Sequence, residues 1–170
     1  MACIRQIFLF ANIVAFHLVT MQAKSSFKFT NINCSDQDIK FSHFEICRLK
    51  VIGRGVVSLN IKAELYKTPV TNSTIIMALY KKSNGFQPYL YNYTIDVCAF
   101  FENRKRYPVV KMIFAYNDAI VVKDLVLNED MFRFLPLPAA EYVFKMKVFA
   151  YNDLKSTVEV RFHRQDSLMP

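Results

Sequence analysis

Hydrophobic and polar residues alternate along most of the chain with a period of two. The alternation is clearest in residues 56–65, where Val57, Leu59 and Ile61 share one side and serine, asparagine and lysine occupy the other. Because successive side chains of a β-strand point to opposite faces, this period predicts strands with one buried face. Similar patterns predict further strands at residues 27–33, 44–52, 73–82, 89–97, 120–127, 140–151 and 156–163.

One segment departs from this alternation. Val97, Phe100, Phe101 and Arg104 recur at spacings of three and four, which predicts a short helix over residues 97–104. Short alternating strands separated by turn residues are typical of an antiparallel β-sandwich. The chain is therefore predicted to be all-β, with a closed barrel as the alternative arrangement.

The first 23 residues have the character of a secretory signal peptide. Arg5 precedes an apolar run over residues 7–16, and polar residues follow it. A membrane span needs about 20 apolar residues, whereas Asn12 and His17 interrupt a shorter run here. We expect residues 1–23 to be cleaved, with an uncleaved anchor as the alternative. Residues 24–170 are then expected to form one secreted, extracellular domain that does not span the membrane.

Composition refines this expectation. Hydrophobic residues make up 53% of the chain and mean hydropathy is +0.15, so an extensive apolar interior is expected. The formal charge of +8 falls to +7 without the first segment, whose only charged residue is Arg5. A basic extracellular domain favours acidic partners such as anionic lipid headgroups, although the charge could serve solubility alone. Nucleic acid is not an expected partner, because no recognition motif accompanies the charge.

Cys34 and Cys47 are the best candidates for a disulfide. They lie between strand-forming segments and follow the expected signal peptide, and disulfides persist in oxidising compartments. The alternative is a pair of buried free thiols.

Three N-x-S/T sequences are candidate glycosylation sites, at Asn33, Asn72 and Asn92. Asn72 lies at a predicted turn and Asn92 on the polar side of its strand, so both are suitably placed. Asn33 is the weakest candidate, because its middle residue is Cys34.

The sequence does not favour catalysis. His43 and His163 are the only histidines after the expected signal peptide, and the sequence contains no G-x-S-x-G nucleophile motif. Spacings typical of metal ligands are also missing. We expect neither an enzyme nor a bound metal or cofactor.

Several segments together resemble an insect family, the domain of unknown function 1091 family. They are FTNINC, FEICRLK, LYKTPVTN, ALYKKSNGFQPYLYNYTIDVCAFFENRK and LPLPAAEYVFKMKVFAY, in this order. The family is in turn similar to the lipid-recognition β-sandwiches typified by ganglioside-activator and myeloid-differentiation-type (ML) proteins. This resemblance implies an immunoglobulin-like sandwich whose sheets separate to admit an acyl chain, and a role in chemosensation or extracellular signalling.

The chain departs from the family pattern in one respect. The residues after Pro108 lack a longer stretch with a fourth framework cysteine, so the resemblance implies that Cys98 is an unpaired thiol. Part of the rim of a ligand pocket could be missing with it.

The predicted function is binding of a lipid or another small hydrophobic ligand between two sheets. The predicted lining residues are Leu59, Ile61, Met77, Tyr91, Phe100, Phe144 and Met146. Arg104, Lys105 and Arg106 are candidates for holding an anionic headgroup, or else a solvated helix end. The alternative function is an extracellular interaction module with a solid core, acting on a receptor by surface contact.

Overall fold

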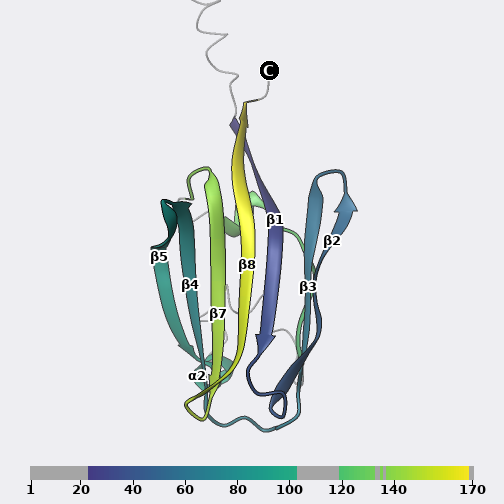
Figure 1. Cartoon of the computed structure of the whole chain (residues 1–170), viewed down its shortest axis with the longest axis vertical. Coiled ribbons are helices and arrows are strands. Elements are labelled where there is room, and N and C mark those ends of the chain that lie inside the picture. The colour runs from purple at the N-terminus through teal and green to yellow at the C-terminus, as the bar shows by residue number, and fades with distance from the viewer. Residues whose placement is uncertain (1–22, 103–118, 133–134, 136, 169–170) are drawn as a thin grey trace, which may run out of the picture.

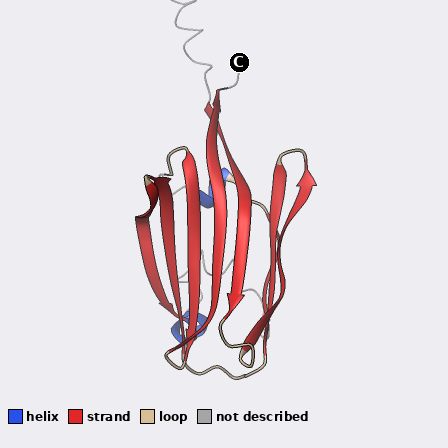
Figure 2. Cartoon of the chain, in the orientation of Figure 1, coloured by secondary structure: helices blue, strands red, loops and turns tan. Residues whose placement is uncertain are grey.

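The computed structural model describes residues 23–102, 119–132, 135 and 137–168, and within this part of the chain nearly all of the regular structure is β-strand. The strands are β1 (Ala23–Asp36), β2 (Ser42–Gly53), β3 (Val56–Leu65), β4 (Ser73–Ser83), β5 (Gly85–Asp96), β6 (Ala119–Leu125), β7 (Ala140–Ala150) and β8 (Asp153–Leu168). Two short helices accompany them, α2 (Val97–Glu102) and the 3-10 helix η2 (Glu129–Phe132) (Figure 2).

The strands form two antiparallel sheets. The large sheet has the order β1-β8-β7-β4-β5, and the small sheet has the order β2-β3-β6. Figure 1 shows the large sheet on the left and centre, with β2 and β3 beside β1 on the right. The prediction of an all-β sandwich is confirmed. The barrel alternative is wrong, because the described strands pair into two separate sheets.

Tight turns link consecutive strands where the sequence offers turn residues. Arg54 and Gly55 connect β2 to β3 between the paired Gly53 and Val56, and Gly55 has a φ of 75°. Such a positive φ favours glycine, which lacks a Cβ. A second tight turn closes the β4–β5 hairpin, where Ser83 and Gly85 are partners.

The predicted helix is present as α2, Val97–Glu102. The last two residues of the predicted range, 103 and 104, lie outside the described residues. Phe100 is 1% exposed and belongs to the apolar core shared by the two sheets. The spacing of three and four therefore identified a helix that buries one face.

A buried lysine anchors the β1–β2 connection to β8. The Lys155 ammonium lies 3.0 Å from a carboxylate oxygen of Asp38 and 5.4 Å from the ring centre of Phe41. Its backbone carbonyl accepts hydrogen bonds from the amides of Gln37 and Asp38. Hydrogen bonding between the two side chains lowers the pKa of Asp38 and raises that of Lys155. A charged, paired lysine therefore fixes this end of the sandwich.

Candidate hydrophobic ligand site

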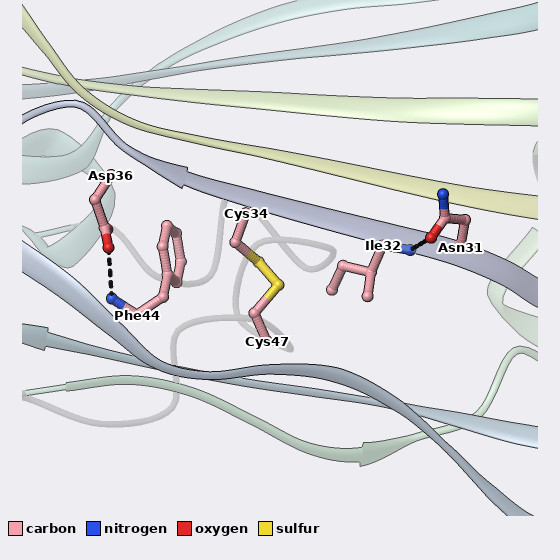
Figure 3. Close-up of a disulfide and its surroundings, with 6 residues drawn as sticks. All are labelled: Asn31, Ile32, Cys34, Asp36, Phe44 and Cys47. Atoms are coloured by element: carbon pink, nitrogen blue, oxygen red, sulfur yellow. Dashed lines mark hydrogen bonds between the residues drawn. A yellow bond between two sulfur atoms is a disulfide. The ribbon is translucent and has the colours of Figure 1, made fainter.

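A disulfide joins the two sheets along one side of the sandwich. Cys34 of β1 is bonded to Cys47 of β2, with their Cα atoms 6.2 Å apart (Figure 3). Figure 3 shows the side chains of Ile32 and Phe44 on either side of the bridge, and both pack against the core. The predicted disulfide is confirmed, and the alternative of two free thiols is wrong.

A row of side chains crosses the inner face of the large sheet, starting at this disulfide. Consecutive cross-strand partners in the row are Cys34, Val158, Met146, Met77 and Tyr93. Partners in an antiparallel pair point to the same face. Val158, Met146 and Met77 are 2%, 7% and 9% exposed, but Tyr93 is 56% exposed. The inner face of the sheet therefore reaches solvent at β5, on the side opposite the disulfide.

A shorter row crosses the small sheet from the other half of the disulfide. Cys47 is paired with Ile61 of β3, and Ile61 with Val122 of β6. Ile61 is buried and Val122 is half-buried against the core. β5 and β6 are the outermost strands of their sheets at this side, and they are not paired with each other. The disulfide thus links the sheets at one side, and strand pairing does not link them at the other.

The inner face of β4 combines apolar residues with one cation. Ile75, Met77 and Leu79 are buried at successive inward positions, and the next inward position is the half-buried Lys81. Its partner across the ladder is Tyr142, whose side chain is fully buried. Lys81 Nζ lies 5.5 Å from the ring centre of Tyr89. Among the described residues, Lys81 makes no ion pair with a carboxylate.

Aromatic rings form a continuous chain beside this lysine. Ring centres are 4.4 Å apart for Phe27 and Phe132, 5.7 Å for Phe132 and Phe162, 5.3 Å for Phe162 and Tyr142, and 5.8 Å for Tyr142 and Tyr89. Stacking at these distances adds to the stabilisation from burial. This aromatic chain takes its rings from β1, η2, β8, β7 and β5 in turn. It lines the end of the core near Lys81.

Tyr142 is the most buried member of this chain. Its hydroxyl donates a 2.7 Å hydrogen bond to the backbone carbonyl of Pro138. Burial, assisted by the nearby Tyr89, raises the pKa of Tyr142 to about 12, although Arg164 opposes the shift. The phenol of Tyr142 is therefore neutral at physiological pH and supplies no negative charge to its ladder partner Lys81.

Six of the seven predicted lining residues come together in the structure. Leu59 and Ile61 of β3, Met77 of β4, Phe100 of α2 and Met146 of β7 are buried in one core cluster. Phe144 is half-buried and packs against this cluster. The side chain of Tyr91 lies outside the described part of the structure.

Lys81 and the aromatic chain were not among the predicted site residues. Lys81 follows Ile75, Met77 and Leu79 at intervals of two, so the alternation already placed it on the inner face. The predicted headgroup residues Arg104, Lys105 and Arg106 lie outside the described residues.

The remaining predicted sites lie on the surface or near it. Asn33, Asn72 and Asn92 are all exposed, so each is accessible for glycosylation, which stays a prediction. Cys98 is half-buried without a disulfide partner, and its Sγ lies 3.2 Å from the carbonyl oxygen of Thr71.

Comparison with known proteins bears on one segment of the chain. Residues 75–116 match the family model described as "Protein of unknown function (DUF1091)". The match begins in β4 at Ile75 and includes β5 and α2, so it contains Met77, Lys81 and Tyr93. It supports the resemblance to this family and brings no activity with it. No curated protein matches the chain.

Within the described ranges, neither helix has the length and apolar character that crossing a bilayer requires.

Proposed function

We propose that this protein is a secreted binding protein for an amphiphile that has an apolar chain and an acidic head. The apolar chain lies between the two sheets, against the inner face of β4. The acidic head is paired with Lys81, at the end of the core that is lined by the aromatic chain.

Lys81 is the observation that carries this proposal. Lys81 is a half-buried lysine without a carboxylate partner among the described residues, and its described neighbours on the inner face are the rings of Tyr89 and Tyr142. An anionic ligand head would supply the missing charge through a charge-assisted hydrogen bond. Arg104, Lys105 and Arg106 remain candidates for additional contacts.

The apolar part of the proposed site is the strip of side chains formed by Ile75, Met77 and Leu79. Lys81 lies four positions after Met77 on β4, which corresponds to about 13 Å at roughly 3.3 Å per residue. An acyl chain of medium length spans such a distance. Met77 and Met146 face each other across adjacent strands, and methionine side chains repack readily around different apolar shapes.

The two sides of the sandwich differ, and this difference supports entry of the ligand at the β5 side. The disulfide fixes the sheets together at β1 and β2, whereas β5 and β6 are free of mutual pairing. Small separation of the sheets at the β5 side would expose the row that ends at Tyr93. The resemblance to lipid-recognition sandwiches supports this reading, since it implies sheets that separate around an acyl chain.

The test compares acids with uncharged analogues of the same chain length. Native mass spectrometry of the protein secreted by the expressing cells should reveal a co-purifying amphiphile. Displacement of a fluorescent fatty acid should then show tighter binding of a fatty acid than of the matching fatty alcohol. Lys81→Gln should weaken binding of the acid about tenfold, because one charge-assisted hydrogen bond is lost, and leave binding of the alcohol unchanged.

Lys147→Gln is the matched control. Lys147 is an exposed lysine on β7, paired with Ile76 and therefore on the outer face of the same sheet. This variant removes the same charge away from the core and should bind both ligands like wild type. Failure of the protein to bind any probe would contradict the proposal and favour a solid-core interaction module. Equal effects of the two variants would show that Lys81 acts only through net charge.

A further inference from the structure

The tip of the β2–β3 hairpin combines exposed aliphatic side chains with unpaired cations. Val51, Ile52 and Val56 are 73%, 48% and 39% exposed. Arg48, Lys50 and Arg54 are exposed beside them. The sequence from Ile46 to Ala63 contains no acidic residue.

The register explains why apolar side chains are exposed there. Val51 is paired with Val57, on the face that carries Cys47 and Leu49 toward the core. Cys47 and Leu49 are half-buried, whereas Val51 is almost fully exposed. The hairpin therefore extends its inner face beyond the core, and Figure 1 shows its tip at one end of the sandwich, at the upper right.

The charges at the tip lack partners within the molecule. Among the described residues, Arg48, Lys50 and Arg54 form no ion pair. The described acidic residue nearest to the tip is Asp124, which lies 3.5 Å from the hydroxyl of Ser58, the partner of Lys50, and forms no ion pair with the three cations. Unpaired cations around an exposed apolar tip are complementary to a surface that is negatively charged outside and apolar beneath.

We propose that the β2–β3 hairpin tip docks the protein on anionic phospholipid membranes. Val51 and Ile52 enter the boundary between headgroups and acyl chains, while Arg48, Lys50 and Arg54 contact the phosphate and carboxylate groups above it. Two weak attractions of this kind act together at a membrane surface. This docking is peripheral and does not depend on the proposed ligand site.

The size and charge of the tip favour a membrane over a protein. A stable protein interface takes about 20 residues from each partner, whereas the exposed tip comprises residues 50–56 and Arg48. Pairing with the same tip of a second copy would bring like charges together. A bilayer needs only a short apolar projection and neighbouring cations.

Sedimentation with vesicles tests the proposal on protein expressed from the full sequence. Wild type should sediment with vesicles of phosphatidylcholine mixed with phosphatidylserine, and much less with phosphatidylcholine alone. Added salt should weaken the binding by screening. A variant with Arg48, Lys50 and Arg54 changed to glutamine should lose about fivefold in affinity for each cation removed. A Val51→Ser, Ile52→Ser variant should lose about tenfold or more.

The β1–β2 turn provides the control at the opposite end of the sandwich. Ile39 is 67% exposed and Lys40 is exposed next to it, so Ile39→Ser with Lys40→Gln removes equivalent groups elsewhere. This control should sediment like wild type. All variants change exposed side chains, and their melting temperatures should match that of wild type.

Three outcomes would overturn the proposal. They are no sedimentation with phosphatidylserine vesicles, sedimentation that survives both tip variants, and tip variants that abolish self-association instead of vesicle binding. The second outcome would assign membrane binding to another part of the chain, including its apolar first segment. Displacement of the fluorescent fatty acid, measured on the same variants, distinguishes a loss of membrane docking from a loss of binding at the proposed ligand site.

Discussion

Removing the disulfide should destabilise the sandwich by a predictable amount. The change is Cys34→Ala with Cys47→Ala, made together so that no single thiol remains to pair with Cys98. Both cysteines are half-buried, and alanine leaves no polar group in their place. The expected loss comes mainly from the unfolded chain, which gains freedom when the cross-link is gone.

The loop length sets the magnitude. The bonded cysteines are separated by 13 positions, and closing a loop of this size lowers the free energy of folding by about 3 kcal/mol at 25 °C in the chain-entropy model. For a chain of this size the melting temperature should fall by roughly 10 °C. The denaturant dependence of unfolding should also steepen, because the unfolded state without the cross-link exposes more surface.

Urea unfolding of oxidised, reduced and double-alanine protein measures the free energy that the disulfide contributes to stability. Oxidised and reduced wild type contain the same side chains, so their difference isolates the bond from any loss of packing. Hydrogen exchange should accelerate on reduction in β1 and β2, the strands that the bond joins. A difference below about 1 kcal/mol, with an unchanged denaturant slope, would refute the reasoning and show that packing alone holds the sheets together.

Three further predictions concern charge, protonation and access. Asp38→Asn should destabilise at neutral pH, and in thermal melts this effect should disappear as the pH falls below 3.8 and through the lower pKa of folded Asp38, because the pair with Lys155 stabilises the folded state only while this carboxylate is ionised. The free energy of unfolding of wild type should fall between about pH 10 and 12, because the phenol of Tyr142 ionises in the unfolded state while it stays neutral in the folded state. Tyr142→Phe should remove this contribution to the fall. At neutral pH the same variant should unfold with a free energy about 1 kcal/mol lower in urea, because a hydrogen bond is lost. Tyr93→Glu should weaken fatty-acid probe binding, whereas Tyr66→Glu, at a tyrosine with the same 56% exposure, should not.

The architecture could be predicted from the sequence because its signals are local. The alternation in residues 56–65 requires only neighbouring residues, and the structure places β3 over the same range, Val56–Leu65. The spacing of Val97 and Phe100 likewise identified α2. The disulfide required one further premise, an oxidising compartment, and the structure supplies the geometry that the premise implied.

The order of the strands could not be predicted in this way, because it depends on contacts between distant segments. β1 pairs with β8, so Ala23 lies opposite Leu168. No local pattern shows that β5 is an outermost strand. The exposure of Tyr93 follows from that position, since alternation alone placed it on the same buried face as Ile95. Ile95 is 2% exposed and Tyr93 is 56% exposed on the same strand.

A β-bulge interrupts β5 without changing which of its residues face the core. Between the partners of Ala78 and Tyr80, β5 advances four residues while β4 advances two, and Leu90 has a φ of 57°. Because the two extra residues are an even number, Tyr89 packs against the core on the same face as Ile95, where counting by two places it. β4 itself shows no positive φ over its length, so counting along β4 stays valid through Lys81.

The regular alternation of β4 explains which part of the candidate site was recoverable from the sequence. The cation on the inner face could have been found by extending the alternation of β4 by one step beyond Leu79. A lysine near a turn is usually solvated, which is the right expectation for Lys82, exposed and paired with Glu141. Two adjacent lysines on one strand must face opposite sides, so one of them had to face inward. Where a strand ends in consecutive charges, the inward one is therefore the residue to examine for a ligand.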